Sequence, residues 1–368
     1  MFRALATCAV LTLAAVPGAV CADTLHVPAE WPTIQSAVDA ASVGDTVQIA
    51  PGVYAECVQL GCGVTLLGDA QSPGLVAIDG EHTHRCVRCE EAGPPATIVG
   101  LTLQNGKGDI GGGVWIDESS AVVTDCIFKD NLSVGHGGGL LARYSSAEIA
   151  RCVFDGNETL ESGICGGGGA SIHGAPATIE DCEFRGNSAR KGGGLAIKVY
   201  ADVSVTGCTF ESNSALFWGG GLLCWESTAR LSGCTFVGNS GGTGGGGIGV
   251  TEYSDMTVSN SIIAFGEDGP SVSVGAATTL SMDCCDLFGN AGGDWVDYIA
   301  DQLGSNGNIE ADPLFCGDAA TATPYALHDA SPCAPDASQC GLIGAWPVEC
   351  LYSPVQETSW GVIKSMYR

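Results

Sequence analysis

The sequence predicts an all-β solenoid, in which short coils of strand and turn stack along one axis. The first observation is a repeat: Cys-x-Phe-x-x-Asn followed by a glycine run recurs between Cys126 and Val250, in steps of 26, 30, 26 and 26 residues. The second is that short runs such as Val203 to Thr206 alternate apolar and polar residues, with no room in a unit for a helix of about ten residues. Such a small unit buries its apolar face only against its neighbours, so the units must stack.

Stacking places each repeat position above its equivalent in the coil before, at about 4.8 Å per coil. Phenylalanines then stack inside the coil, and asparagines stack at a bend, where their amides satisfy the turn backbone. The predicted ladders comprise Cys126, Cys152, Cys182, Cys208 and Cys234; Phe128, Phe154, Phe184, Phe210 and Phe236; and Asn131, Asn157, Asn187, Asn213 and Asn239. The glycine runs supply the bends. The predicted fold is therefore a parallel β-helix of about nine or ten coils.

The first 22 residues have the features of an export signal. Arg3 precedes an apolar run from Ala4 to Val20 that is too short to span a bilayer, and Val20-Cys21-Ala22 ends in a small residue. We therefore expect a signal peptide at 1–22, cleaved after Ala22, and a mature protein that is secreted or held at the cell surface.

A short helix is expected to cap the first coil, within residues 31–43. Ile34, Ala37 and Val38 repeat at helical spacing, and Gly44 ends the pattern. Because the first coil of a solenoid exposes an unpaired strand edge, a helix at this position serves as a cover.

The β-helix is predicted to span residues 23–350. Its clearest repeats lie at 111–290, and the turn-rich stretch 312–350 is expected to form a disulfide-tied cap at the far end. The last segment, 351–368, has no repeat and ends in basic and aromatic residues. It is either a tail that associates with the outer membrane or cell surface, or a helix docked on the last coil.

Two family resemblances agree with this fold. The alternation of Phe-x-x-Asn with Gly-Gly-x-Leu over residues 111–250 resembles the repeat of the chlamydial polymorphic outer-membrane proteins and related bacterial surface proteins. The opening from Thr33 to Tyr54 resembles that of pectate-lyase-like secreted proteins. Both resemblances imply a right-handed coil, as does the chirality preference of parallel crossovers. Neither resemblance implies an activity.

Charge argues against nucleic acid as a partner. The chain has 14 Lys and Arg residues against 41 Asp and Glu residues, a formal net charge of −27, and no Lys or Arg lies between Arg230 and Lys364. Polyanions are repelled by such a surface, although a local basic patch is compatible with this composition. No pattern in the sequence indicates an oligomeric state.

Nineteen cysteines indicate an oxidising compartment. The ladder cysteines point the same way, which is a poor geometry for bridging, so we expect packed free thiols there. Bridges are expected among the loop cysteines, namely Cys57 with Cys62, Cys86 with Cys89, and within the group Cys316, Cys333, Cys340 and Cys350. The alternative for the first four is a zinc site.

One column of outward positions varies from coil to coil, unlike the ladders around it. It forms the candidate binding face, which comprises Asp117, Arg143, Tyr144, His173, Lys198, Trp225 and Glu226. Tyr144 and Trp225 are expected to stack on sugar rings, and Arg143 or Lys198 to make polar contacts. An unconstrained solvent face would vary in the same way, so both interpretations stay open.

The predicted function is an extracellular or cell-surface scaffold that is adhesive or binds polysaccharide or cell-surface glycan, without catalysis. One alternative is a polysaccharide lyase or glycoside hydrolase acting along the column from Asp117 to Trp225. Such chemistry needs acidic calcium ligands with a basic residue, or paired carboxylates. Calcium would be the cofactor of that alternative, and the scaffold needs none. The other alternative is a passive coat or spacer.

Overall fold

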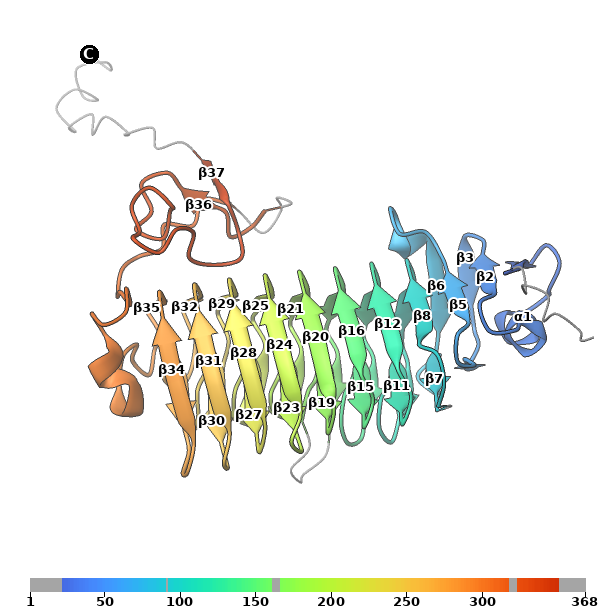
Figure 1. The fold of residues 1–368 in the computed structure, drawn as a ribbon, viewed down its shortest axis with the longest axis horizontal. Coiled ribbons are helices and arrows are strands. Elements are labelled where there is room, and N and C mark those ends of the chain that lie inside the picture. The colour runs from blue at the N-terminus through green and yellow to red at the C-terminus, as the bar shows by residue number, and fades with distance from the viewer. Residues whose placement is uncertain (1–21, 91, 161–165, 318–322, 351–368) are drawn as a thin grey trace, which may run out of the picture.

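The protein is a right-handed parallel β-helix, shown as a long rod in Figure 1. The computed structural model describes residues 22–90, 92–160, 166–317 and 323–350. Most of the predicted signal peptide and all of the predicted tail lie outside these residues. No helix within the described part of the chain is long and apolar enough to cross a membrane.

Three long sheets run along the rod, and a fourth, shorter sheet lies beside them. Sheet A contains β1 (Thr24–Val27), β2 (Thr46–Ile49), β5 (Thr65–Leu67), β8 (Ala96–Val99), β12 (Ala121–Thr124), β16 (Ala147–Ala150), β20 (Pro176–Glu180), β24 (Asp202–Thr206), β28 (Thr228–Ser232), β31 (Asp255–Ser259) and β34 (Thr279–Asp283). Sheet B contains β3 (Gly52–Tyr54), β6 (Val76–Asp79), β9 (Thr102–Gln104), β13 (Ile127–Lys129), β17 (Val153–Asp155), β21 (Glu183–Arg185), β25 (Thr209–Glu211), β29 (Thr235–Val237), β32 (Ile262–Ala264) and β35 (Asp286–Phe288).

The remaining strands form the other long sheet, the short lateral sheet and a final pair. Sheet C contains β4 (Val58–Gln59), β7 (Val87–Cys89), β11 (Val114–Asp117), β15 (Leu140–Arg143), β19 (Ala170–His173), β23 (Leu195–Lys198), β27 (Leu222–Trp225), β30 (Ile248–Thr251) and β33 (Val272–Val274). Sheet D contains β10 (Lys107–Gly108), β14 (Leu132–Ser133), β18 (Glu158–Thr159), β22 (Ser188–Lys191) and β26 (Ser214–Trp218). The pair consists of β36 (Leu327–His328) and β37 (Val348–Cys350). Helical turns are α1 (Ile34–Ala40), η1 (Pro73–Leu75) and η2 (Asp297–Gln302).

The rod is longer than the nine or ten coils predicted, because sheet A has 11 strands. The extra length is at the start of the chain, where β1 pairs in register with β2 and β2 with β5. These early coils lack the Cys-x-Phe-x-x-Asn motif, so the repeat could not reveal them.

The phenylalanine and asparagine ladders form as predicted. Neighbouring rings from Phe128 to Phe236 stack with centroids 4.4 to 4.8 Å apart and planes within 8° of parallel. At the next bend, the amide of Asn157 donates to the carbonyl of Phe128 at 2.9 Å. The Oδ1 atom of Asn187 accepts from the Asn157 backbone at 2.9 Å. Each amide therefore satisfies backbone groups that the strand ladder leaves unpaired at a corner.

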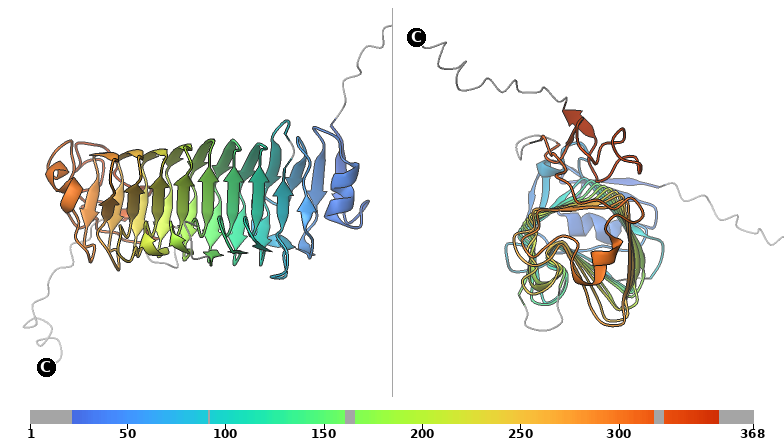
Figure 2. Two further views of the ribbon diagram at one scale, coloured as in Figure 1. Left: turned by 90° about the horizontal axis from the view of Figure 1, so that it is seen from below. Right: turned by 90° about the vertical axis from the view of Figure 1, so that its left-hand side faces the viewer.

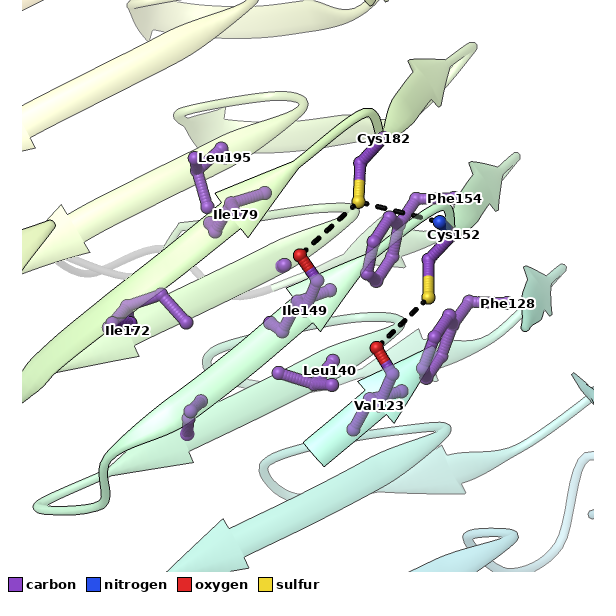
Figure 3. Close-up of a cluster of buried hydrophobic side chains, with 14 of the residues drawn as sticks. Val123, Phe128, Leu140, Ile149, Cys152, Phe154, Ile172, Ile179, Cys182 and Leu195 are labelled. Carbon is purple, nitrogen blue, oxygen red and sulfur yellow. Dashed lines mark hydrogen bonds between the residues drawn. The ribbon is translucent and has the colours of Figure 1, made fainter. Parts of the chain in front are cut away.

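The ladder cysteines are free, buried thiols, as predicted. Figure 3 shows the thiol of Cys182 donating to the carbonyl of Ile149, with an Sγ–O distance of 3.7 Å. The backbone N–H of Cys152 donates to the same sulfur at 3.4 Å. Ser261 takes this role one coil after Cys234, whose N–H donates to the serine hydroxyl at 3.1 Å. The position thus requires a small buried side chain that both accepts and donates.

Both ends of the rod are covered. The predicted capping helix is present as α1, which buries Ile34, Ala37 and Val38 on the first coil. At the far end, Trp295 and Ile299 are buried against the last coil. Covering both ends removes exposed edges at which another chain could pair.

The stretch predicted to be an end cap, of which residues 312–317 and 323–350 are described, instead lies along the outer side of sheet B (Figure 1). Its Ile343 packs in a cluster with Ile262 of β32, and the indole Nε1 of Trp346 donates to the Thr209 hydroxyl at 2.8 Å. The outward-facing apolar side chains Ile262 and Ala264 at the end of sheet B explain this position, because only a lateral segment can bury them.

The disulfides join Cys284 to Cys340 and Cys316 to Cys350, so both tie down the lateral segment. The prediction that Cys333 forms a bridge was wrong, since its thiol is buried and donates to Asp286 at 3.1 Å. The predicted bridges Cys57 to Cys62 and Cys86 to Cys89 were also wrong: all four are free. Cys86 and Cys89 are buried in the core, which removes them from bridging with the loops.

Replacing one ring of the phenylalanine ladder should destabilise the protein strongly. We expect Phe184→Ala to lower the free energy of unfolding by about 3–5 kcal/mol, because it opens a cavity between two stacked rings. Urea unfolding followed by circular dichroism measures this. The half-buried Phe288, at the end of the rod, provides the control: a Phe288→Ala loss as large as that of Phe184→Ala would contradict the ladder as the main source of stability.

Candidate binding face

The strand register brings the predicted column together on the outer face of sheet C. Consecutive strands pair Asp117 with Arg143, Arg143 with His173, His173 with Lys198 and Lys198 with Trp225. The alternate residues of these strands, such as Ile116 and Ala142, are in the core. The column therefore faces away from the core, as the sequence predicted.

Much of the column is nevertheless covered. His173 and Lys198 are only 6% and 2% exposed. The cover is the segment that carries sheet D, which forms a narrower lobe beside the main coil in the end-on view of Figure 2. A side chain in place of Gly192, in this segment, would contact Ala196 and Leu223 of sheet C. The expectation of an open face thus fails for the middle of the column.

The first two members of the column, Asp117 and Arg143, form an ion pair with each other. The Nε and Nη2 atoms of Arg143 donate to the two carboxylate oxygens of Asp117 at 2.7 and 2.6 Å. The hydrogen bonds to Asp117 raise the pKa of Arg143, although partial burial opposes the shift. This bidentate ion pair leaves Arg143 fewer hydrogen-bond donors for a ligand than the sequence suggested.

Two neutral histidines meet at the middle of the column: His173 belongs to the column, and His136 comes from the connection between β14 and β15. The rings of His136 and His173 meet edge to face with centroids 4.6 Å apart, and His173 Nε2 lies 2.8 Å from the Ser171 hydroxyl. Burial, together with the charges of Lys198 and Arg143, lowers the pKa of His136 to about 4. Burial and neighbouring His136 lower that of His173 to about 2. Both imidazoles are therefore uncharged at neutral pH.

Basic side chains cover the two tryptophans of this face. The Nζ atom of Lys191 lies 4.0 Å from the ring centre of Trp225, and that of Lys198 lies 5.8 Å away. At the other end, the guanidinium groups of Arg85 and Arg88 lie 4.6 and 4.9 Å from the ring of Trp115. Such cation–π contacts stabilise by about 0.5–2 kcal/mol each. Trp225 is therefore not the open stacking platform that the sequence predicted.

Three tyrosines form an exposed row at the turn that follows sheet C. Tyr144, Tyr200 and Tyr253 are 55%, 79% and 75% exposed. They follow β15, β23 and β30, which are separated by one intervening strand each, so the row uses every second coil. Backbone hydrogen bonds, such as Tyr144 N–H to the His173 carbonyl, stack this turn on that of the next coil. We call Tyr144, Tyr200 and Tyr253 the tyrosine row.

The tyrosine row is held in an unfavourable backbone conformation. Its members have φ values of 51°, 61° and 56°, a region that bulky residues rarely adopt. Between the first two coils of the row lies Gly174, where a side chain would meet the Tyr144 ring at 2.5 Å. The ring of Tyr144 therefore lies over the next coil, and glycine leaves space for it.

Sequence reasoning found Tyr144 but missed Tyr200 and Tyr253. Tyr144 directly follows its column residue, Arg143, whereas Val199 or Glu252 intervenes in the other two turns. A strict spacing rule therefore lost them. A search for aromatic residues anywhere in the turn would have found the row.

A family model agrees with the fold. Residues 138–309 match a family model described as the right handed beta helix region. The fold is a right-handed β-helix. A solved structure of a variant of the PL6 family alginate lyase AlyGC is similar at a TM-score of 0.30 and 13% sequence identity, over 91% of this chain. This chain spans 60% of the length of that enzyme. A search of the curated proteins finds no match.

The residues considered for a zinc site do not gather in this β-helix. Cys86 and Cys89 are buried in the core, whereas Cys57 is exposed. Within the described ranges, no group of three or more His, Cys, Asp or Glu side chains is arranged to hold a metal ion.

The buried histidines should make the fold sensitive to acid. The unfolded chain has histidine pKa values of about 6.5, whereas these two histidines have lower pKa values in the folded protein. As the pH falls below about 6.5, only the unfolded chain binds a proton at these positions, so the folded state loses stability. We expect His173→Gln to reduce the loss of stability between pH 7 and pH 4.5 by about 2–3 kcal/mol. Urea midpoints across this range measure it. The exposed His26 gives the control variant, His26→Gln, and equal pH profiles for the two variants would contradict the assignment.

Proposed function

We propose that this protein is an extracytoplasmic scaffold that binds an extended, neutral polysaccharide along its rod. The observation that carries the proposal is the tyrosine row. Exposed aromatic rings offer flat apolar faces, on which the apolar face of a pyranose ring can stack, and a phenolic group for hydrogen bonding. Large exposed aromatics in strained backbone conformations are costly to keep, which favours a functional role.

The spacing of the row suits a linear polymer. Two coils advance by about 9.6 Å along the axis, which is comparable to the length of a disaccharide unit in an extended chain. Every second sugar of such a chain would therefore meet a tyrosine. The ring faces are positioned by a rigid lattice of in-register strands, so little order has to be created on binding.

The polar groups beside the row favour a neutral ligand. Glu118, Glu226 and Glu252 lie in the turn after sheet C, as the tyrosines do, and like them have positive φ values. Glu252 directly precedes Tyr253, whereas Glu118 and Glu226 belong to coils that carry no tyrosine of the row. Carboxylates accept hydrogen bonds from sugar hydroxyls but repel carboxylated or sulfated chains. The net charge of −27 also repels carboxylated or sulfated chains.

Location outside the cytoplasm is part of the proposal. The two disulfides support an oxidising compartment, which agrees with the signal peptide expected at 1–22. Attachment to the outer membrane or cell surface through residues 351–368 is an additional proposal on which polysaccharide binding does not depend.

Calorimetric titration with neutral β-linked oligosaccharides of two and six sugars tests the proposal. The six-sugar ligand should bind more tightly than the two-sugar ligand, because it reaches more than one tyrosine. Tyr200→Ala, at the centre of the row, should weaken binding of the longer ligand about tenfold, whereas Tyr200→Phe should keep most of it.

The matched control for this test is Tyr298→Ala, which removes a tyrosine that is 54% exposed in η2, outside the row. Equal effects of Tyr200→Ala and Tyr298→Ala would contradict the row as the binding site. Absence of binding to every oligosaccharide would leave the passive coat or spacer as the better interpretation.

A polysaccharide lyase is the second candidate, favoured by the neutral histidines beside Lys198. A neutral imidazole is the form that removes a proton, and a nearby cation would stabilise the resulting charge. The burial of His173 and Lys198 opposes this candidate. A glycoside hydrolase has less support, because Asp117 is paired with Arg143 and the other carboxylate of the candidate binding face, Glu226, follows a strand four positions further along sheet C.

Polymer length distinguishes catalysis from binding. The scaffold proposal predicts that polysaccharides incubated with the protein, with and without calcium, keep their length in size-exclusion chromatography. Shortening that Lys198→Ala or Asp117→Ala abolishes would establish an enzyme instead.

A further inference from the structure

An open hollow of about 660 Å³ lies near the start of sheet D and is rich in basic side chains. The connection between β6 and β7 supplies one side, and β7 and β10 supply the others. The basic and imidazole groups that line it are His82, His84, Arg85, Arg88 and Lys107. This concentration is unusual in a chain with 14 basic and 41 acidic residues. We call this hollow the basic pocket.

The two arginines of the basic pocket are held against one indole. Arg85 and Arg88 both lie within 5 Å of the ring centre of Trp115, and Arg85 also donates through Nη2 to the carbonyl of Ile110 at 3.1 Å. Burial, and then the charge of Arg88, lower the pKa of Arg85. Two like charges held this close are unfavourable without an anion between or beside them.

The acidic groups nearby do not neutralise the basic pocket. Glu90 forms an ion pair with Arg88, and Asp109 lines the pocket. Among the described residues, neither Arg85 nor Lys107 takes part in an ion pair. Three cations therefore face two carboxylates.

Arg85 has donors to spare. Its hydrogen bond to the Ile110 carbonyl uses one hydrogen of Nη2. The second Nη2 hydrogen, together with the neighbouring N–H of Nε or Nη1, leaves a planar fork that matches a carboxylate, sulfate or phosphate. Lys107 is exposed and can bring a third set of donors to the same group.

We propose that the basic pocket binds the oxyanion group of a small anionic molecule, with Arg85 and Lys107 as its principal ligands. The group is a carboxylate, a sulfate ester or a phosphate ester, which share the geometry that a guanidinium recognises. This site is separate from the tyrosine row and does not depend on neutral polysaccharide binding. Its volume exceeds that of a bare ion, so part of the molecule that carries the anion also fits.

Calorimetric titration of the full chain with four monosaccharide probes tests the proposal. D-glucuronate, glucose 6-sulfate and glucose 6-phosphate carry the three oxyanions, and glucose carries none. The anionic probes should bind and glucose should not. A preference among the three would identify the carboxylate, the sulfate or the phosphate as the natural group.

Two variants locate the site. Lys107→Gln and Arg85→Gln should each weaken binding of the preferred probe at least tenfold, as expected for the loss of a charge-assisted hydrogen bond. Lys107 is exposed, so its substitution should leave the fold intact even if Arg85→Gln disturbs the packing on Trp115. Lys129→Gln, which changes another exposed lysine on β13, is the control.

The proposal is overturned if glucose binds as well as the anions, if no anion binds, or if Lys107→Gln and Lys129→Gln behave alike. Tyr200→Ala should leave anion binding unchanged. Anion binding without neutral oligosaccharide binding would support the basic pocket while removing the proposed function. The reverse result would remove the basic pocket alone.

Discussion

The in-register pairing of each coil with the next is the constraint on which the whole structure depends. Every strand in the three long sheets is parallel to its neighbours, so the same residue position recurs above itself through the rod. At the corners, where strands end, backbone groups would lose their partners. Asparagine amides such as Asn157, and thiols such as Cys182, supply the missing bonds. Stacked phenylalanines then fill the interior that these corners enclose.

The same lattice determines what the surface can do. Because coils advance by a constant step, a side chain placed in one turn is repeated at known intervals, as in the tyrosine row. The lattice also tolerates unfavourable backbone conformations, since the coils on either side hold Tyr200 and Tyr253 at positive φ values. The basic pocket differs because it forms where this regularity begins, among irregular connections, and there unlike side chains can converge.

The ladders and the face of sheet C that carries the column were predictable from spacing, since one register applies to every coil. The accessibility of that face was not. Sheet D has strands as short as two residues, such as β14 and β18, and these leave no alternation that could be recognised in the sequence. Their position over sheet C buries His173 and brings Lys191 onto Trp225. Pairing of Cys284 with Cys340 was likewise hidden, because it joins the last coil to a segment that folds back.

The sequence by itself determined the parallel β-helix, its interior ladders, the free ladder thiols and the capping helix, because each follows from a short motif repeated at one period. Tertiary structure decided which outward residues stay exposed, which cysteines pair and which basic groups meet. Those outcomes depend on how non-repeating segments fold against the rod. Tyr144 illustrates the division: its place in the column came from spacing, but its membership of a row with Tyr200 and Tyr253 appeared only when the turns were stacked.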